Sequence, residues 1–221
     1  MDHNYSKNGL VFWNADEIRM RRVMEEHFVA GLTNCLKSLN RAWEFVQIEA
    51  PILTPRDLIN KNYTDDNIFV TANDLALRPE TTMGSYAYAE WLIATQRMRP
   101  PICVWQHGKS FRQEQDQVVK NMRLKEFYQL EFQCIYSLST KADYSAVVVP
   151  NMCKVISQLL GECKVEDSER LPDYAHWTKD IVCRGMEVCS ISLRKDLKDM
   201  SVLEVAIGTD RCVYNFYNKG E

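Results

Sequence analysis

An alternating run of polar and apolar side chains between Phe127 and Tyr136 is the first feature that could carry chemistry. Tyr128, Leu130, Phe132, Cys134 and Tyr136 occupy its even positions, and Phe127, Gln129, Glu131 and Gln133 begin its odd positions. Because side chains alternate across a β-strand, the even set suits a core and the odd set places a ring, two amides and a carboxylate on one face. The pattern alone is equally typical of a solvated face on an edge strand.

Charged residues upstream and downstream favour a binding role for that face. Phe111-Arg112-Gln113-Glu114 places an Arg and a Glu on one face of the preceding strand. The planar guanidinium fits phosphate oxygens, and a carboxylate beside it can accept from an exocyclic amine. Further charged pairs or single charges stand at Arg78 and Glu80, at Glu187, at Arg194 and Asp196, and at Glu204 and Arg211. Taken singly, each of these also fits a surface ion pair.

The helices and strands that would position these side chains are expected along the whole chain. Asn14 followed by Glu17 is a candidate capping box, and apolar residues recur at helical spacing from Met20 to Trp43. A strand over 45–49 would end at Pro51, because proline cannot occupy the interior of a sheet. The first half also predicts short strands at 68–71 and 76–77, a helix over 80–98 and a strand over 102–106.

The second half continues this pattern of locally paired strands with helices between them. It predicts antiparallel strands at 111–114 and 127–136 joined by a long mobile loop, a helix over 143–160 bent or broken near Pro150, strands at 186–192 and 202–207, and a short helix after Gly208-Thr209. Such an order is typical of helices that flank a mainly antiparallel sheet. The sequence therefore predicts a single α+β domain over residues 1–221.

The composition is that of an ordinary soluble globular protein, with 46% hydrophobic and 26% charged residues. A net charge of −3 argues against a protein that coats nucleic acid, although it does not exclude a local basic patch. The eight cysteines follow no secretory signal, so we expect reduced thiols in a cytoplasmic protein. No apolar run has the length needed to cross a bilayer, so no membrane role is expected.

In order and spacing, these motifs resemble the catalytic core of class II aminoacyl-tRNA synthetases, most closely the dimeric type of glycyl-tRNA synthetase. Leu77-Arg78-Pro79-Glu80-Thr81 is similar to the L-R-P-E-T signature of that type. The segments at about 20–55, 108–136 and 202–217 resemble motifs 1, 2 and 3 of the class, and Thr178 to Ile181 with Glu187 and 190–196 resembles a further conserved block. The resemblance covers roughly residues 10–217. It leaves no room for the anticodon-binding domain of full synthetases, so we expect no anticodon reading in the usual way.

The resemblance implies an ATP site with Mg²⁺, formed by Arg112, Glu114, Arg123, Phe127, Glu187 and Arg211. Arg112 would contact the α-phosphate, Phe127 and Arg211 would sandwich the adenine, and Glu114 would accept from its amine. Glu187 would help to hold the Mg²⁺ on the ATP phosphates. No protein nucleophile is implied, so Arg112 and Arg211 would be catalytic through positioning and electrostatics.

The resemblance also implies an amino-acid site formed by Glu80, Gln129, Glu131, Arg194 and Glu204. The three glutamates would surround the substrate ammonium, and Arg194 would take its carboxylate. Two positions depart from the glycine-specific pattern: Ala206 stands where that type usually has Ser, and Gln133 stands where a second Glu is common. Both departures fall in the amino-acid half, so the identity of the amino acid stays open.

Three functions are compatible with this resemblance. The first is ATP-dependent activation of a small amino acid to an aminoacyl adenylate, with transfer to a tRNA acceptor end, a carrier protein or another acceptor. The second is a non-catalytic relative that binds nucleic acid or a partner, as the accessory subunit of the mitochondrial DNA polymerase does. The third is a regulatory or biosynthetic paralogue. A homodimer through the first long helix and the strand at Pro51 is expected, as motif 1 forms in the class.

Overall fold

The computed structural model describes residues 6–113, 122–169, 171–197 and 199–218. Its main element is a seven-stranded sheet in the order β3-β6-β7-β11-β10-β9-β8. The strands are β3 Glu44–Gln47, β6 Ile102–Phe111, β7 Glu126–Ser137, β8 Cys163–Asp167, β9 Ala175–Cys183, β10 Met186–Arg194 and β11 Met200–Gly208. Only the β3–β6 pair is parallel, so the expected α+β architecture with a mainly antiparallel sheet is confirmed.

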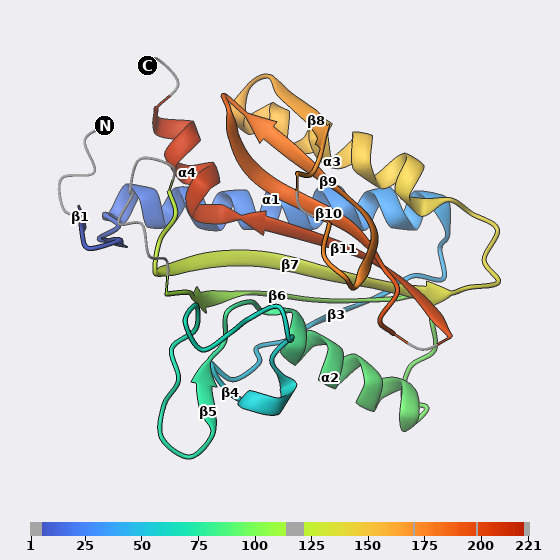
Figure 1. Cartoon of the computed structure of the whole chain (residues 1–221). Coiled ribbons are helices and arrows are strands. Elements are labelled where there is room, and N and C mark those ends of the chain that lie inside the picture. The colour runs from blue at the N-terminus through green and yellow to red at the C-terminus, as the bar shows by residue number, and fades with distance from the viewer. Residues whose placement is uncertain (1–5, 114–121, 170, 198, 219–221) are drawn as a thin grey trace.

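Helices cover the two faces of this sheet unequally (Figure 1). The helices are α1 Ala15–Leu39, α2 Thr82–Ala94, α3 Tyr144–Leu160 and α4 Thr209–Tyr217. The larger core joins α1, α3 and α4 to residues such as Leu130 and Phe132 on one face, whereas α2 packs against Ile102, Val104 and Ile135 on the other. Short elements complete the chain: β1 Ser6–Lys7, β2 Leu10–Val11, β4 Leu53–Pro55, the 3₁₀ turn η1 Arg56–Leu58 and β5 Leu75–Leu77.

The first long helix begins where the sequence predicts and ends earlier. The Asn14 side chain accepts hydrogen bonds from the backbone N–H groups of Asp16 and Glu17 at 2.9 and 3.0 Å, and Glu17 Oε2 accepts from the Asn14 N–H at 2.8 Å, so the capping box is confirmed. The helix stops at Leu39, and Trp43 lies beyond it, where its indole packs on Tyr144 with ring centroids 5.2 Å apart. Trp43 is buried by tertiary packing and not by the helix. Its position in the sequence continues the helical spacing by coincidence.

Several predicted boundaries are wrong. The strands expected at 102–106 and 111–114 are one strand, β6, which runs through Gly108 and ends at Phe111. The helix expected over 80–98 spans only Thr82–Ala94, and the strand expected at 68–71 is a single bridge between Val70 and Ala76. The helix expected over 143–160 is one element from Tyr144 to Leu160, so it does not break at Pro150.

Two strands of the seven-stranded sheet were not expected, nor were the short strands β1, β2 and β4 outside it. β8 lies at the sheet edge, and all of its side chains after Cys163 are exposed, so no alternation marks it in the sequence. β9 joins β8 to β10 and carries Thr178 and Asp180 on the face that bears the functional cleft. Among the helices of the described residues, none is long and apolar enough to cross a membrane.

Candidate nucleotide and amino-acid cleft

A cleft of about 730 Å³ lies on the sheet face opposite α1 and α3. Its floor comes from β7, β9, β10 and β11, and its walls come from the segments around Tyr63, Arg112 and Tyr174. Every described residue of the predicted ATP and amino-acid sites lines it except Arg194, which lies buried against Glu204. Glu114 lies outside the described residues.

The alternation along β7 divides the strand as the sequence predicts. Leu130 and Phe132 are buried in the large core, while Phe127, Gln129 and Glu131 line the cleft. β7 lies between β6 and β11 in the middle of the sheet, so the alternative interpretation as a solvated edge strand is wrong. The odd face of β7 is therefore the floor of the cleft.

The inner half of the cleft contains three buried carboxylates. Glu131 accepts hydrogen bonds from the Thr81 and Thr82 hydroxyls, the latter at 3.1 Å. Glu204 Oε2 lies 3.1 Å from the same Thr82 hydroxyl and accepts from Gln133 Nε2 at 2.8 Å.

Glu80, at the inner wall, accepts from the Tyr63 hydroxyl at 2.7 Å. The exposed fractions of Glu80, Glu131 and Glu204 are 7%, 2% and 6%. Neighbouring hydroxyl and amide groups therefore hold all three carboxylates in fixed positions.

This cluster carries more negative charge than its surroundings compensate. Burial, and then the charges of Glu204 and Glu80, raise the pKa of Glu131 to about 8. Burial and the charge of Glu204 also raise the pKa of Glu80, against the opposing effect of Arg112. Among the described residues, the buried Oε1 of Gln129 has no hydrogen-bond partner, and Gln129 lines the same cleft. The inner half thus combines an unpaired hydrogen-bond acceptor with carboxylates that repel one another. A bound cation would stabilise both features.

Arg194 gives its donors to protein carboxylates on both sides. Its Nη1 lies 2.7 Å from Glu204 Oε2, and its Nε and Nη2 lie 3.1 and 2.6 Å from the two oxygens of Asp196. The guanidinium also lies between the rings of Tyr86 and Tyr174, 4.9 and 3.8 Å from their centroids. In this arrangement, Arg194 orients Glu204 at the cleft floor.

The outer half of the cleft is more open. Arg112 donates from Nε to the Pro79 carbonyl at 3.0 Å, and its guanidinium carbon lies 5.5 and 5.2 Å from the Tyr63 and Phe127 ring centroids. Arg211, which also lines the cleft, donates from Nη1 to the Glu187 carbonyl at 3.0 Å and lies 3.5 Å from the Glu187 carboxylate. The predicted phosphate and adenine residues thus share one cavity.

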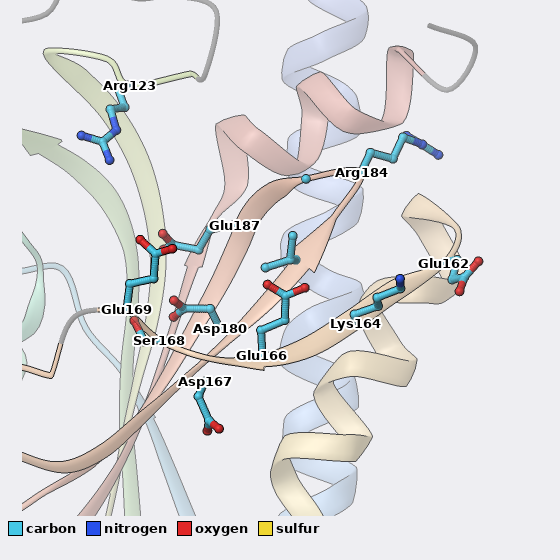
Figure 2. A pocket seen from close by; sticks show the side chains of 12 residues that line it. Arg123, Glu162, Lys164, Glu166, Asp167, Ser168, Glu169, Asp180, Arg184 and Glu187 are labelled. Atoms are coloured by element: carbon cyan, nitrogen blue, oxygen red, sulfur yellow. The ribbon is translucent and has the colours of Figure 1, made fainter.

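An acidic groove of about 930 Å³ adjoins this outer half (Figure 2). It is lined by Arg123, Glu162, Lys164, Glu166, Asp167, Ser168, Glu169, Asp180, Val182, Arg184, Gly185 and Glu187. Arg123, Ser168, Asp180 and Glu187 line both cavities. In the described part of the chain, no three His, Cys, Asp or Glu side chains are placed to hold a metal ion. The Glu187 oxygens suit Mg²⁺ only as part of a set completed by phosphate oxygens and water.

Some residues of the cleft could not be found from the sequence. Tyr63 lies in a segment without periodicity between β4 and β5, and Tyr174 precedes the unexpected strand β9. Arg78, which the L-R-P-E-T signature does include, is structural: it donates to the carbonyls of Lys109 and Ala50, both at 2.7 Å. A Cβ on Gly108 would lie 2.2 Å from Arg78 Nη2, which explains a glycine inside β6.

One structural comparison shows a shared fold, and one sequence comparison finds a partial match. No protein-family profile matches the chain. A glycine–tRNA ligase from Mycolicibacterium vanbaalenii is 37% identical over 68 residues, which are 31% of this chain and 14% of that protein. The crystal structure of prolyl-tRNA synthetase from Cryptosporidium parvum, complexed with halofuginone and AMPPNP, superimposes with a TM-score of 0.70 at 14% identity. That match covers 96% of this chain and 48% of that chain, so this chain spans about half the length of the solved synthetase.

The match at this level of identity concerns the fold. The described residues form a mixed α+β structure with a large, mostly antiparallel sheet, as in the catalytic region of an aminoacyl-tRNA synthetase. The odd face of β7 lines the one cleft that contains the predicted ATP residues and most of the predicted amino-acid residues.

Proposed function

We propose that this chain binds ATP and a small amino acid in the cleft and joins them as an aminoacyl adenylate. A carboxylate oxygen of the amino acid would attack the α-phosphorus of ATP, and the bond from that phosphorus to pyrophosphate would break. The observation that carries the proposal is one cleft with a buried acceptor cluster at its inner end and Arg112 and Arg211 at its outer end. The partial match to a glycine–tRNA ligase supports the same chemistry.

The inner half supports recognition of an ammonium group. An ammonium offers three N–H donors. Gln129 Oε1 has no partner among the described residues, and the Glu131 carboxylate beside it on β7 is buried with the charges of Glu80 and Glu204 nearby. A bound cation would reduce the repulsion among the three carboxylates. Ligands that carry an amine would therefore bind more tightly than ligands without one.

The substrate carboxylate would lie toward Arg112, at the junction of the two halves. The Arg194 donors directed at Glu204 and Asp196 support a different role for that residue, in which it holds Glu204 in place. Arg112 would then face both the attacking carboxylate and the α-phosphate, where negative charge accumulates in the transition state.

The outer half supports the nucleotide. Phe127 and Arg211 both line the cleft, and an adenine held there would stack between the ring and the guanidinium. Arg123 stands at the entrance, and Glu187 offers hard oxygen ligands beside the phosphate path. A Mg²⁺ bound there would neutralise phosphate charge.

A small substrate side chain is supported by the residues beside Glu131. Ala206 on β11 and Ser190 on β10 follow Glu131 across the sheet, and both line the cleft. Ala206 removes the hydroxyl typical of the glycine type, so we leave the choice among small amino acids to experiment. The acceptor would be a tRNA end or a carrier protein, in the cytoplasm.

The acidic groove argues against the nucleic-acid-binding alternative. Six carboxylates line it beside the cleft, among them Glu166, Asp167 and Glu169, against three basic side chains. A phosphate backbone lying along this groove would be repelled, so a tRNA acceptor end would have to reach the cleft from another side. No contact of the described residues favours the regulatory or biosynthetic paralogue.

The decisive assay is ATP–pyrophosphate exchange with each of the twenty amino acids in turn, together with calorimetric titration of ATP and Mg²⁺. We expect exchange with one amino acid or a few small ones. If none supports exchange and ATP does not bind, adenylation is not the function. ATP binding without exchange would leave a nucleotide-binding protein and reject the enzyme.

A homodimer is also proposed, through the surface that follows β3. An apolar groove of about 590 Å³ near Pro51 is lined by Leu53, Leu58, Tyr88 and Trp91, which are 39–54% exposed. A second copy of the chain would cover this apolar surface. Light scattering at micromolar concentration should give twice the chain mass, and Leu53→Glu should halve it. A monomeric mass for the unaltered chain would contradict the dimer.

A further inference from the structure

One buried carboxylate connects the backbone segment that carries Phe127 to the one that carries Arg211. Asp210 lies in the first turn of α4, next to Arg211, and is 2% exposed. Its Oδ2 accepts a hydrogen bond from the backbone N–H of Tyr128 at 2.9 Å, and Tyr128 follows Phe127 on β7. The backbone neighbours of the two proposed adenine-contacting residues are therefore tied together by a single side chain.

The need for this tie follows from the sheet topology. The β7–β11 ladder ends at the pair Gln129 and Gly208, because β11 turns into α4 at Thr209. Beyond that pair, Tyr128 has no strand partner on the β11 side, and a buried backbone group without a partner is costly. Asp210 accepts from the Tyr128 N–H, and the Thr209 hydroxyl donates to the Tyr128 carbonyl at 3.2 Å. Two side chains thus continue the ladder where the strand stops.

Arg21 on α1 completes this arrangement from the opposite face of the sheet. Its Nη1 lies 2.8 Å from Asp210 Oδ1, and its guanidinium carbon lies 3.9 Å from the Tyr128 ring centroid. Burial raises the pKa of Asp210, and the Arg21 charge opposes that shift. Arg21 therefore favours the ionised form of Asp210, which accepts the stronger hydrogen bond from Tyr128.

We infer that Asp210 and Arg21 are positioning residues for the nucleotide, which set the separation of Phe127 and Arg211 without touching the ligand. The inference rests on the proposed function and deepens it, because it assigns adenine recognition to a contact between α1 and α4 as well as to the cleft wall. It predicts a loss confined to the adenine-contacting part of the ligand, because the phosphate residue Arg112 belongs to the segment after β6.

The test uses the full chain with Asp210→Asn, which keeps the side-chain shape and removes the charge. Calorimetry would compare the affinity for ATP with Mg²⁺ and that for tripolyphosphate with Mg²⁺. We expect ATP affinity to fall roughly tenfold or more, because a buried charge-assisted hydrogen bond is lost, while tripolyphosphate affinity is unchanged. Arg21→Lys keeps the charge and loses the stacking on Tyr128, so it should weaken ATP binding less.

A matched control separates positioning from general loosening. Arg184→Met removes hydrogen bonds to the carbonyls of Leu160 and Asn215, near the ends of α3 and α4 and away from the adenine walls. It should lower the melting temperature and leave ATP affinity unchanged.

The other possible results of these titrations would each support or reject the role of Asp210. If folded Asp210→Asn binds ATP like the unaltered chain, or loses both ligands equally, Asp210 is not a positioning residue. If Asp210→Asn does not fold, Arg21→Lys decides by the same comparison of the two ligands. If the unaltered chain binds tripolyphosphate but not ATP, adenine recognition itself is absent and both proposals fall. Normal ATP binding by the unaltered chain with no effect of either variant overturns this inference alone.

Discussion

The inner and outer halves of the cleft differ in how deeply their charged side chains are buried. The inner half is buried, and its ion pair is tight, with Arg194 and Glu204 at 3% and 8% side-chain exposure and 2.7 Å apart. The outer half is more exposed, and its ion pair is longer, with Arg211 and Glu187 at 25% and 49% side-chain exposure and 3.5 Å apart. One ion pair is part of the protein interior, and the other lies at the boundary with solvent.

This difference indicates how each half would recognise its ligand. Buried charges act through a low dielectric and are held by many hydrogen bonds, so the inner half is selective before any ligand arrives. Solvent-exposed charges are screened, so they contribute little to stability. Their contribution to binding grows when a ligand excludes the water around them. We therefore expect changes in the inner half to affect folding and changes in the outer half to affect binding.

The largest expected effect is on stability, from the inner ion pair. Arg194→Met leaves the buried carboxylate of Glu204 without its cation, so the free energy of unfolding should fall by about 3–5 kcal/mol. Arg211→Met, the matched change in the outer half, should cost about 1 kcal/mol or less. Urea denaturation of both variants measures the difference, and equal losses would contradict the division into two halves.

A large effect on rate without loss of fold is expected from Arg112. Arg112→Ala removes the cation proposed to face the α-phosphate, and exchange should fall by about 10²–10³. The circular dichroism spectrum should be retained, because Arg112 is only partly buried. An unchanged exchange rate would show that this segment does not bind the reacting phosphate.

The pH dependence of stability should come from the inner half. The folded-state pKa of Glu131, about 8, lies above the ordinary glutamate value of 4.5, so the folded chain binds more protons than the unfolded chain between these values. Stability is therefore largest at the acid end and falls as the pH rises through this window, by at most about 1.4 kcal/mol per pH unit. Glu131→Gln should flatten this slope in urea titrations. The same slope in the variant would assign the proton elsewhere.

The smallest effect should come from the cleft entrance. Arg123 is exposed, so Arg123→Ala should weaken ATP binding about fivefold or less, and the difference should vanish at high salt. Calorimetric titration at two salt concentrations checks this. A large, salt-independent loss would place Arg123 with the inner residues.

The sequence by itself determined the face of β7 that lines the cleft and the start of α1, because both depend on neighbours along the chain. Alternation between Phe127 and Gln133 follows from the strand geometry, and the Asn14 capping box closes within one helical turn. The motif order, read as a resemblance, predicted the fold, and nine of the residues that it assigned to the two sites line the cleft.

Only the tertiary structure decided which charges neutralise one another. Arg194 pairs with Glu204 because β10 lies beside β11, and Arg21 reaches Asp210 across 189 positions of sequence because α1 packs on α4. The edge strand β8 has no apolar face to show in the sequence, and Tyr63 reaches the cleft from a segment without regular spacing. Local periodicity records which side of an element is buried, whereas partners across the sheet are set by register and packing, which no single segment contains.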